Sequence, residues 1–234
     1  MEIDPMAMSE TLKDASTDGD NSGRTTREEW VELALEILIN DGVANVKVMN
    51  LAQTLNVSRS SFYWFFKSRR DLLNQLLHHW EHKNTASIVE HAGRPAHSIS
   101  EAVMNLFECW IGETKFDPRL DFAVREWARR SPEVHRRVDE ADTTRTSTIA
   151  AMYQRHGFSE NEAFIRARVL YFMQVGYYAL QVSEPLDVRL SYTEDYIRSF
   201  TGEQPTITEL NRFRSSVKKI AAQNAVATSS NRRN

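Results

Sequence analysis

Helix-start signals recur along almost the whole chain, and they restrict its fold more than any other feature. A Ser, Thr or Asp at such a position accepts hydrogen bonds from the free amides of a helix's first turn. Apolar residues spaced three or four apart follow these positions, as on one face of a helix. No segment sustains the alternation of apolar and polar residues that marks a strand. The sequence therefore predicts an all-α protein with helices that begin at Thr26, Ser58, Ser68, Ser98, Asp117, Ser131, Ser159 and Ser191.

The composition favours a globular protein in a reducing compartment. The chain has 234 residues, of which 41% are hydrophobic and 26% are charged, and these fractions are ordinary for a globular protein. No apolar run approaches the roughly 18 residues that a membrane-spanning helix needs, and residues 1–24 lack the apolar core of a signal peptide. The single cysteine, Cys109, excludes an internal disulfide. We therefore expect a cytoplasmic protein without a membrane partner.

The chain divides into four segments of different composition. The first segment is rich in Ser, Thr, Asp and Gly and contains six acids and two bases, which is typical of a disordered arm. A long helix that runs toward Glu90 is expected to join the second and third segments. The last segment contains six basic residues, with one amphipathic helix expected over 208–222. The expected order is an acidic arm over 1–24, a three-helix head over 25–73, a helical domain over 74–202 and a basic C-terminal extension over 203–234.

The segment from Val43 to Arg70 has an unusual charge. It contains five cations and no acid, although the whole chain has a net charge of −3. A local basic surface can bind phosphate even when the total charge is negative. The plain alternative is a chance cluster on a solvated surface, and charge alone does not decide between them.

A short helix, a tight turn and a second short helix are predicted within this segment. Asn56 tolerates the left-handed backbone that such a turn needs. In the second helix the three phenylalanines at positions i, i+3 and i+4 form an inner face, and the polar residues lie outside. This arrangement fits either a helix-turn-helix that enters the major groove of DNA or an ordinary helical hairpin. The inner face is Phe62, Phe65 and Phe66, the outer face is Arg59, Ser60, Tyr63 and Lys67, and Ser61 and Trp64 lie at the margins.

Residues 48–73, VMNLAQTLNVSRSSFYWFFKSRRDLL, resemble the DNA-binding signature of TetR-type transcriptional regulators. Asn56 replaces the usual glycine of the turn, Ser60 replaces the usual glycine of the recognition helix, and Lys47 replaces a capping Ser or Thr. The resemblance implies a homodimeric repressor that binds double-stranded DNA and is released by an unknown small-molecule effector. It implies base reading by Arg59, Ser60 and Ser61 and phosphate positioning by the cations and aromatics. The implied DNA-binding residues are Lys47, Ser58, Arg59, Ser60, Ser61, Tyr63, Trp64, Lys67 and Arg69.

Aromatic residues are numerous in the region after the long helix. Most are expected in the core, but some suit the ligand cavity that the resemblance implies. We expect this cavity between the helix at 70–90 and the aromatic helices that follow it, with Arg125 available to an anionic group. The helices at 160–183 and 191–201 carry excess apolar residues and are expected to form the homodimer. The predicted ligand-binding residues are Phe107, Trp110, Phe122, Arg125, Trp127 and Tyr177.

Two other classes of function are weighed against this prediction. The sequence has no glycine-rich phosphate loop, serine-centred elbow or HExxH motif, and Cys109 has no evident activating base. His78 and His82 are four residues apart, but no third metal ligand is near. We therefore expect no enzyme, no catalytic residue, no cofactor and no metal. A helical adaptor that binds only protein is the alternative to DNA binding.

Overall fold

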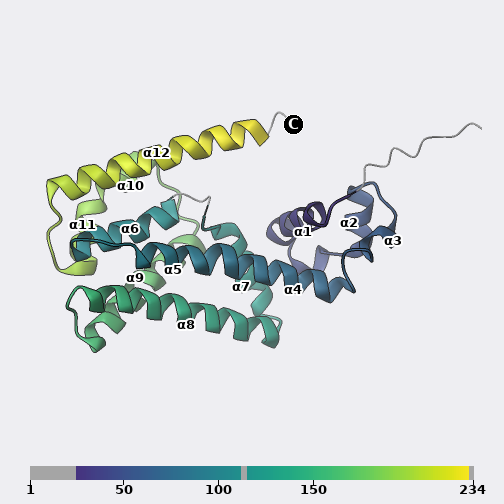
Figure 1. Ribbon diagram of the computed structural model, residues 1–234, viewed down its shortest axis with the longest axis horizontal. Helices are drawn as coiled ribbons and strands as arrows, with labels where there is room; N and C mark the ends of the chain where they lie inside the picture. Colours follow the sequence, from purple (N-terminus) through teal and green to yellow (C-terminus); the bar gives the residue numbers. More distant parts are fainter. Residues whose placement is uncertain (1–24, 112–114, 232–234) are drawn as a thin grey trace, which may run out of the picture.

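The structure is a computed structural model that describes residues 25–111 and 115–231, with side chains up to residue 224. The prediction of a disordered arm over 1–24 lies outside the described residues. Helices are the only regular elements across these two ranges, and the prediction of an all-α fold is confirmed. Figure 1 shows a small head at one end of an elongated body, with α4 running from one to the other.

The head contains three helices, a 3-10 turn and the start of a longer helix. Figure 1 places α1, α2 and α3 together at the end of the molecule from which α4 leads away. The elements are α1 (Arg27–Asp41), η1 (Val43–Asn45), α2 (Val48–Thr54), α3 (Arg59–Phe62) and α4 (Arg69–Trp80).

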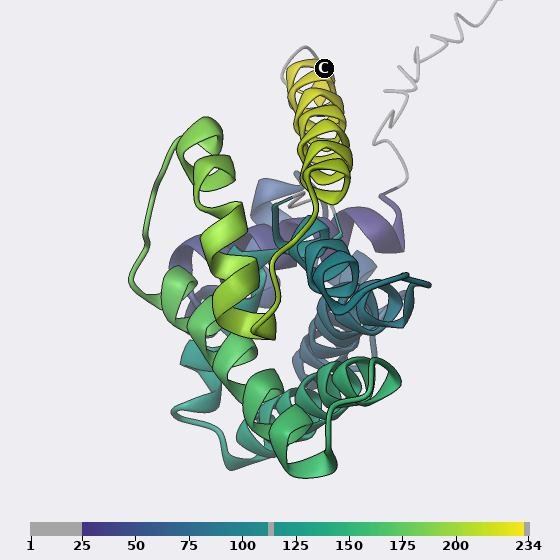
Figure 2. The same ribbon diagram turned by 90° about the vertical axis from the view of Figure 1, so that its left-hand side faces the viewer.

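The body is a bundle of helices, and the C-terminal helix lies along one side of it (Figures 1 and 2). A π-helical turn, η2, joins α4 to α5, so the expected long helix toward Glu90 is present with one irregular turn. The elements of the body are η2 (Glu81–Thr85), α5 (Ala86–Gly93), α6 (Ile99–Ile111), α7 (Pro118–Ala128), α8 (Pro132–Arg155), α9 (Glu160–Ala179), α10 (Leu186–Ser191), α11 (Thr193–Thr201) and α12 (Ile207–Asn231).

Most of the predicted helix starts are confirmed by their caps. Thr26 forms a capping box with Glu29 at the start of α1. The side chains of the predicted caps before α4, α6, α7, α8 and α9 each accept a hydrogen bond from the amide three residues later. Such caps satisfy amides that a helix start would leave unpaired.

One predicted cap bond is absent and one predicted helix start is wrong. Ser58 is the N-cap residue of α3, as predicted, but its hydroxyl makes no cap bond and lies 2.8 Å from the hydroxyl of Ser60. Ser191 ends α10 instead of starting a helix, and its hydroxyl donates to the carbonyl of Val188 at 2.6 Å. The next helix, α11, begins at Thr193.

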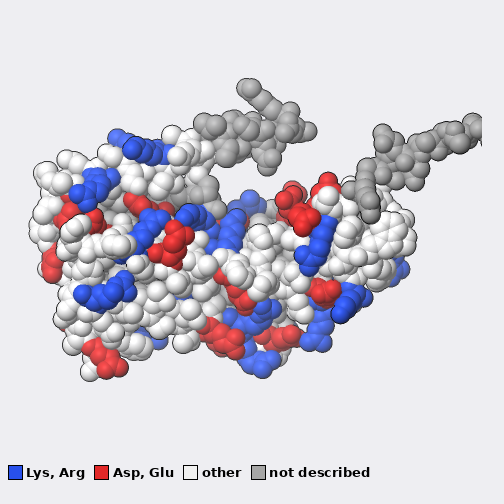
Figure 3. Space-filling view, in the orientation of Figure 1, with Lys and Arg blue, Asp and Glu red and all other residues white. Residues whose placement is uncertain are grey.

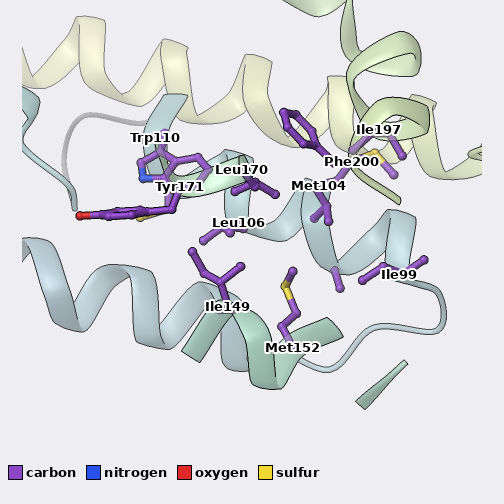
Figure 4. Packing of buried hydrophobic residues seen from close by; sticks show 14 of the residues in the cluster. Ile99, Met104, Leu106, Trp110, Ile149, Met152, Leu170, Tyr171, Ile197 and Phe200 are labelled. Carbon is purple, nitrogen blue, oxygen red and sulfur yellow. The ribbon is translucent and has the colours of Figure 1, made fainter. Parts of the chain in front are cut away.

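Two clusters of buried apolar residues stabilise the fold. The larger one fills the body, where residues of α6, α8, α9 and α11 meet (Figure 4). Leu210, Phe213 and Val217 of α12 belong to it, and α12 extends well beyond the expected 208–222. The second cluster joins the head to α4, α7 and the first half of α8. The boundary expected at residue 73 therefore falls inside a continuous core.

A buried group of charged residues lies where η2, α7, α8 and α9 meet. Arg145 is fully buried and donates to the carboxylate of Asp121 at 2.9 Å. Arg125 and the indole of Trp80 also donate to Asp121, each at 2.8 Å. Burial alone would raise the pKa of Asp121, but Arg145 and Arg125 outweigh it and hold the pKa at about 2. Asp121 is therefore charged and paired at neutral pH.

We predict that Asp121→Asn lowers the free energy of unfolding by about 3–5 kcal/mol at pH 7, because it leaves a buried arginine without its partner. The pKa of Asp121 lies below its usual value of 3.8, so its contribution is present above about pH 4 and is lost as the pH falls toward 2. Urea unfolding of both proteins at several pH values measures the difference, which should shrink in that range.

Asp139→Asn is the matched control, because the Asp139 side chain is 63% exposed and pairs only with a surface histidine in the described residues. This exposed change should alter stability by less than about 1 kcal/mol. Equal effects of the two substitutions would contradict the role given to Asp121.

Candidate nucleic-acid interface

The turn between α2 and α3 gives the head its helix-turn-helix form. Asn56 has a φ of 54°, the left-handed conformation expected for it. The amide of Val57 donates to the carbonyl of Ala52 at 3.0 Å, which closes the end of α2. A non-glycine residue reaches this backbone region at low cost only when it is short and polar. The tight turn predicted from the sequence is confirmed.

Aromatic packing fixes α3 to the rest of the head. Phe62 and Phe66 are 0% and 1% exposed. The Phe62 ring packs edge-on against Trp30 at 5.4 Å between centroids and stacks on Phe66 at 5.1 Å. Phe65 is partly buried against the same cluster. The three rings therefore face inward as predicted, but α3 ends at Phe62, so the prediction of one helix that carries all three rings and reaches Lys67 is wrong.

The outward side of this region has polar and aromatic side chains. Arg59 and Tyr63 are exposed and lie near each other, with 3.4 Å between the guanidinium and the phenol oxygen. Trp64 is 75% exposed, which is unusual for so large an apolar side chain. On the face seen in Figure 3, the cations of the head are separate and do not form one continuous patch. The exposed residues of this segment include Lys47, Met49, Ser58, Arg59, Ser60, Tyr63, Trp64, Lys67 and Arg69.

Two of the predicted DNA-binding side chains have structural partners. Ser61 is only 8% exposed, and its hydroxyl donates to the carbonyl of Ser58 at 2.6 Å. Its predicted base-reading position is therefore wrong in this conformation. The Arg69 guanidinium donates to the carbonyls of Val46 and Val43 at 2.5 and 2.6 Å. It ties the start of α4 to the segment before α2, a role that the adjacent basic pair in the sequence did not reveal.

The six predicted ligand-binding residues do not form one site. Phe107, Trp110 and Tyr177 line a hollow of about 60 Å³, between α6, α9 and the three helices after it. This hollow has no lining residue from the helix at 70–90, but a separate surface hollow is lined by His79, His82 and Glu90 of that helix. The expected position of the ligand cavity stays a prediction. Sequence reasoning missed seven polar or aromatic residues in the lining, of which Tyr192 and Tyr196 are four apart in the sequence. The seven are Gln174, Glu184, Arg189, Tyr192, Thr193, Tyr196 and Phe213.

The other three predicted residues lie elsewhere. Phe122 is 44% exposed on α7, and Trp127 packs against the cluster that contains the head. Arg125 pairs with Asp121 at 2.8 Å and with Asp142 at 2.6 Å. Because two carboxylates neutralise Arg125, it is not available to an anionic ligand in this conformation.

Cys109 and the pair of His78 and His82 are the other residues that the sequence offered for chemistry. Cys109 is buried, and this burial raises the pKa of its thiol to about 12, so the nucleophilic thiolate is absent at neutral pH. The rings of His78 and His82 lie 4.4 Å apart. Over the described ranges, no group of three or more His, Cys, Asp or Glu residues could hold a metal ion. In the same ranges no helix is long and apolar enough to cross a membrane.

Comparison with known proteins agrees with the geometry of the head. Residues 31–76 match the sequence model of the bacterial regulatory proteins of the tetR family. The chain therefore carries the helix-turn-helix segment of TetR-type transcriptional regulators, and the resemblance seen in its sequence is confirmed. A search of curated proteins found no match.

Solved structures share the fold over most of the chain. A tetR-family regulatory protein from Rhodococcus RHA1 is 15% identical, with a TM-score of 0.59 over 78% of this chain and 100% of its own. AmtR of Mycobacterium smegmatis is 16% identical, with a TM-score of 0.55 over 86% and 96%. GusR of Salmonella enterica is 12% identical, with a TM-score of 0.53 over 83% and 94%. These likenesses show a shared all-α fold over most of the chain.

We predict that Arg69→Met lowers the free energy of unfolding by about 1–3 kcal/mol, because a charged donor loses two hydrogen bonds to backbone carbonyls, of which the one to Val46 is partly buried. Arg70→Met is the matched control, since the Arg70 side chain is 76% exposed and pairs with Glu133 at the surface. Urea unfolding measures both variants. Equal stability of the two would show that Arg69 does not brace the head.

Proposed function

We propose that the protein is a repressor that binds a palindromic operator in duplex DNA as a homodimer and is released by a small ligand. The observation that carries this proposal is the fixed outward face of α3. Phe62 and Phe66 anchor the helix, and Arg59, Ser60 and Tyr63 are exposed on its other side. The match of this segment to the tetR family supports DNA as its partner.

The exposed residues suit two kinds of DNA contact. The major groove is about 12 Å wide and admits a helix, with base edges within reach of its N-terminal residues. Arg59 is the first residue of α3, where a guanidinium can bridge two acceptors of a guanine. Lys47 and Lys67 lie outside α3 on either side of it and suit phosphate oxygens. Ser60 and Tyr63 complete the surface.

The homodimer is supported by an exposed apolar stripe on α9. Phe164, Ile165, Val169 and Phe172 are 46–56% exposed, and the guanidinium of Arg168 lies over the rings of Phe164 and Phe172 at 5.3 and 4.7 Å. An apolar surface of this kind is a common interaction site. A two-fold dimer through it would present two recognition helices with the symmetry of a palindrome.

Release by a ligand requires coupling between the hollow and the head. The head shares a core with α7 and α8, and α8 also contributes to the core of the body. A ligand shifts the position of the heads only if it binds the two conformations with different affinity. Helix α8 contributes residues to both cores and therefore links the body to the head.

We predict that Arg59→Ala and Lys67→Ala weaken DNA binding in different ways in a mobility-shift assay. Loss of a base contact at Arg59 should cost roughly 1–3 kcal/mol on a palindromic fragment from the gene's own upstream region and little on a scrambled duplex. Loss of a phosphate contact at Lys67 should weaken both duplexes and reduce the salt slope by about one. Titrations at several salt concentrations measure both effects.

Two outcomes of this assay would contradict the assignments. If Arg59→Ala weakens both duplexes equally and changes the salt slope, Arg59 contacts phosphate instead of bases. If the folded protein binds no fragment of the upstream region, DNA binding fails, and the exposed Trp64 then favours the helical adaptor that binds only protein.

We predict that Phe172→Glu converts the dimer to a monomer at micromolar concentration, because a carboxylate in the stripe would be buried at the interface. Phe122→Glu is the matched control, since the two phenylalanines are 46% and 44% exposed but lie on different helices. Light scattering measures the mass of each variant. A monomeric wild-type protein that still binds operator would refute the dimer.

A further inference from the structure

The hollow between α6, α9 and the last three helices has two kinds of wall. Most of the lining is aromatic or apolar, and the rings of Phe107 and Trp110 lie 6.1 Å apart. At Tyr177 the polar groups already have partners. Its hydroxyl donates to Glu184 at 3.2 Å, and the guanidinium of Arg189 lies 5.4 Å from its ring centroid. The aromatic part therefore suits a flat apolar group.

Two donors in this lining lack partners among the residues that the structure describes. They are the indole nitrogen of Trp110 and the side-chain amide nitrogen of Gln174. Trp110 is 2% exposed and Gln174 is 7% exposed, so neither nitrogen can be assumed to be solvated by bulk water. Buried N–H groups almost always have an acceptor. Both nitrogens are covered by protein in this conformation, so an acceptor oxygen of a bound molecule reaches them only when the lining shifts.

We propose that this hollow binds a small aromatic molecule with a carbonyl or carboxylate oxygen, which accepts hydrogen bonds from Trp110 and Gln174. The proposal rests on the proposed function in that it names the chemistry of the ligand that would release DNA. The aromatic ring would lie among the aromatic side chains of the lining. The oxygen would supply the acceptor that these two nitrogens lack in the described residues.

The size of the hollow implies that α10 moves when a ligand enters. A volume of about 60 Å³ holds a few water molecules, while a cavity that binds benzene has roughly 150 Å³. The six-residue α10 buries only Leu190, and it follows a turn in which Gln181 has a φ of 52°. A short helix with one buried residue is the part of the lining that can shift at least cost.

The test uses calorimetric titration of the full chain without DNA, with acetophenone, benzoate and ethylbenzene as probes. These molecules share a ring and differ in the acceptor. We expect acetophenone or benzoate to bind at least about tenfold more tightly than ethylbenzene, because only they satisfy the buried donors. The stronger of the two shows whether the site prefers a neutral or an anionic oxygen. Equal binding of ethylbenzene, or no binding of either oxygen-bearing probe at millimolar concentration, would overturn the proposal.

Variants separate this role from a structural one. Gln174→Met and Trp110→Phe should each weaken the oxygen-bearing probe about tenfold and leave ethylbenzene within about twofold. Gln174→Met should also raise the unfolding temperature of the ligand-free protein, because it removes an unsatisfied donor. Trp30→Phe is the matched control, since the Trp30 indole nitrogen also lacks a partner in the described ranges but lies in the head. Unchanged probe affinity in both lining variants would overturn the assignment.

The two proposals fail separately. If the oxygen-bearing probes bind more tightly than ethylbenzene but the operator complex persists in their presence, the ligand site is supported and release of DNA by the ligand is refuted. If the protein binds the operator but binds ethylbenzene as tightly as the oxygen-bearing probes, the proposed DNA-binding function is supported and the assigned ligand chemistry is wrong.

Discussion

The buried pairing of Asp121 with Arg145 is the interaction on which the arrangement of head and body depends. Arg145 is fully enclosed, and its guanidinium also donates to Thr85 of η2 at 3.0 Å and to Tyr171 of α9 at 3.0 Å. A buried charge needs a partner and several hydrogen bonds to be tolerated. Four elements must therefore meet in one geometry, and α7, which supplies Asp121, is also the helix that supports the head.

The head depends on a second constraint, the contact of Phe62 with Trp30 and Phe66. α3 is only four residues long, and isolated helices of that length are not stable in water. Its position comes from these rings, the left-handed Asn56 and the brace that Arg69 supplies. The two constraints share one apolar cluster, so the exposed face of α3 has a defined place relative to the body.

Local signals predicted the helices well because capping is a short-range effect. Thr26, Ser68, Ser98, Asp117, Ser131 and Ser159 all start helices as expected, and the spacing of Phe62 and Phe66 predicted which side of this segment faces inward, although α3 ends at Phe62. Partners distant in the chain were not predictable in the same way. Arg69 and Arg125 looked available for ligands as isolated cations, but the carbonyl of Val46 and the carboxylate of Asp142 reach them only after folding. No sequence pattern pointed to Gln174 as a binding residue, because a buried donor without a partner can be recognised only when its neighbours in the fold are known.

Because the head and α7 share one continuous core, only certain segments of this protein can be exchanged with those of another protein. Leu120 and Val124 of α7 are 1% and 0% exposed in the cluster that contains the head, and Arg119 of the same helix donates to Asn40 of α1 at 2.6 Å. A chimera that exchanged only residues 25–73 would set these side chains against a foreign surface. The unit that can be transplanted with its packing intact is discontinuous in sequence, since it includes α7 together with the helix-turn-helix.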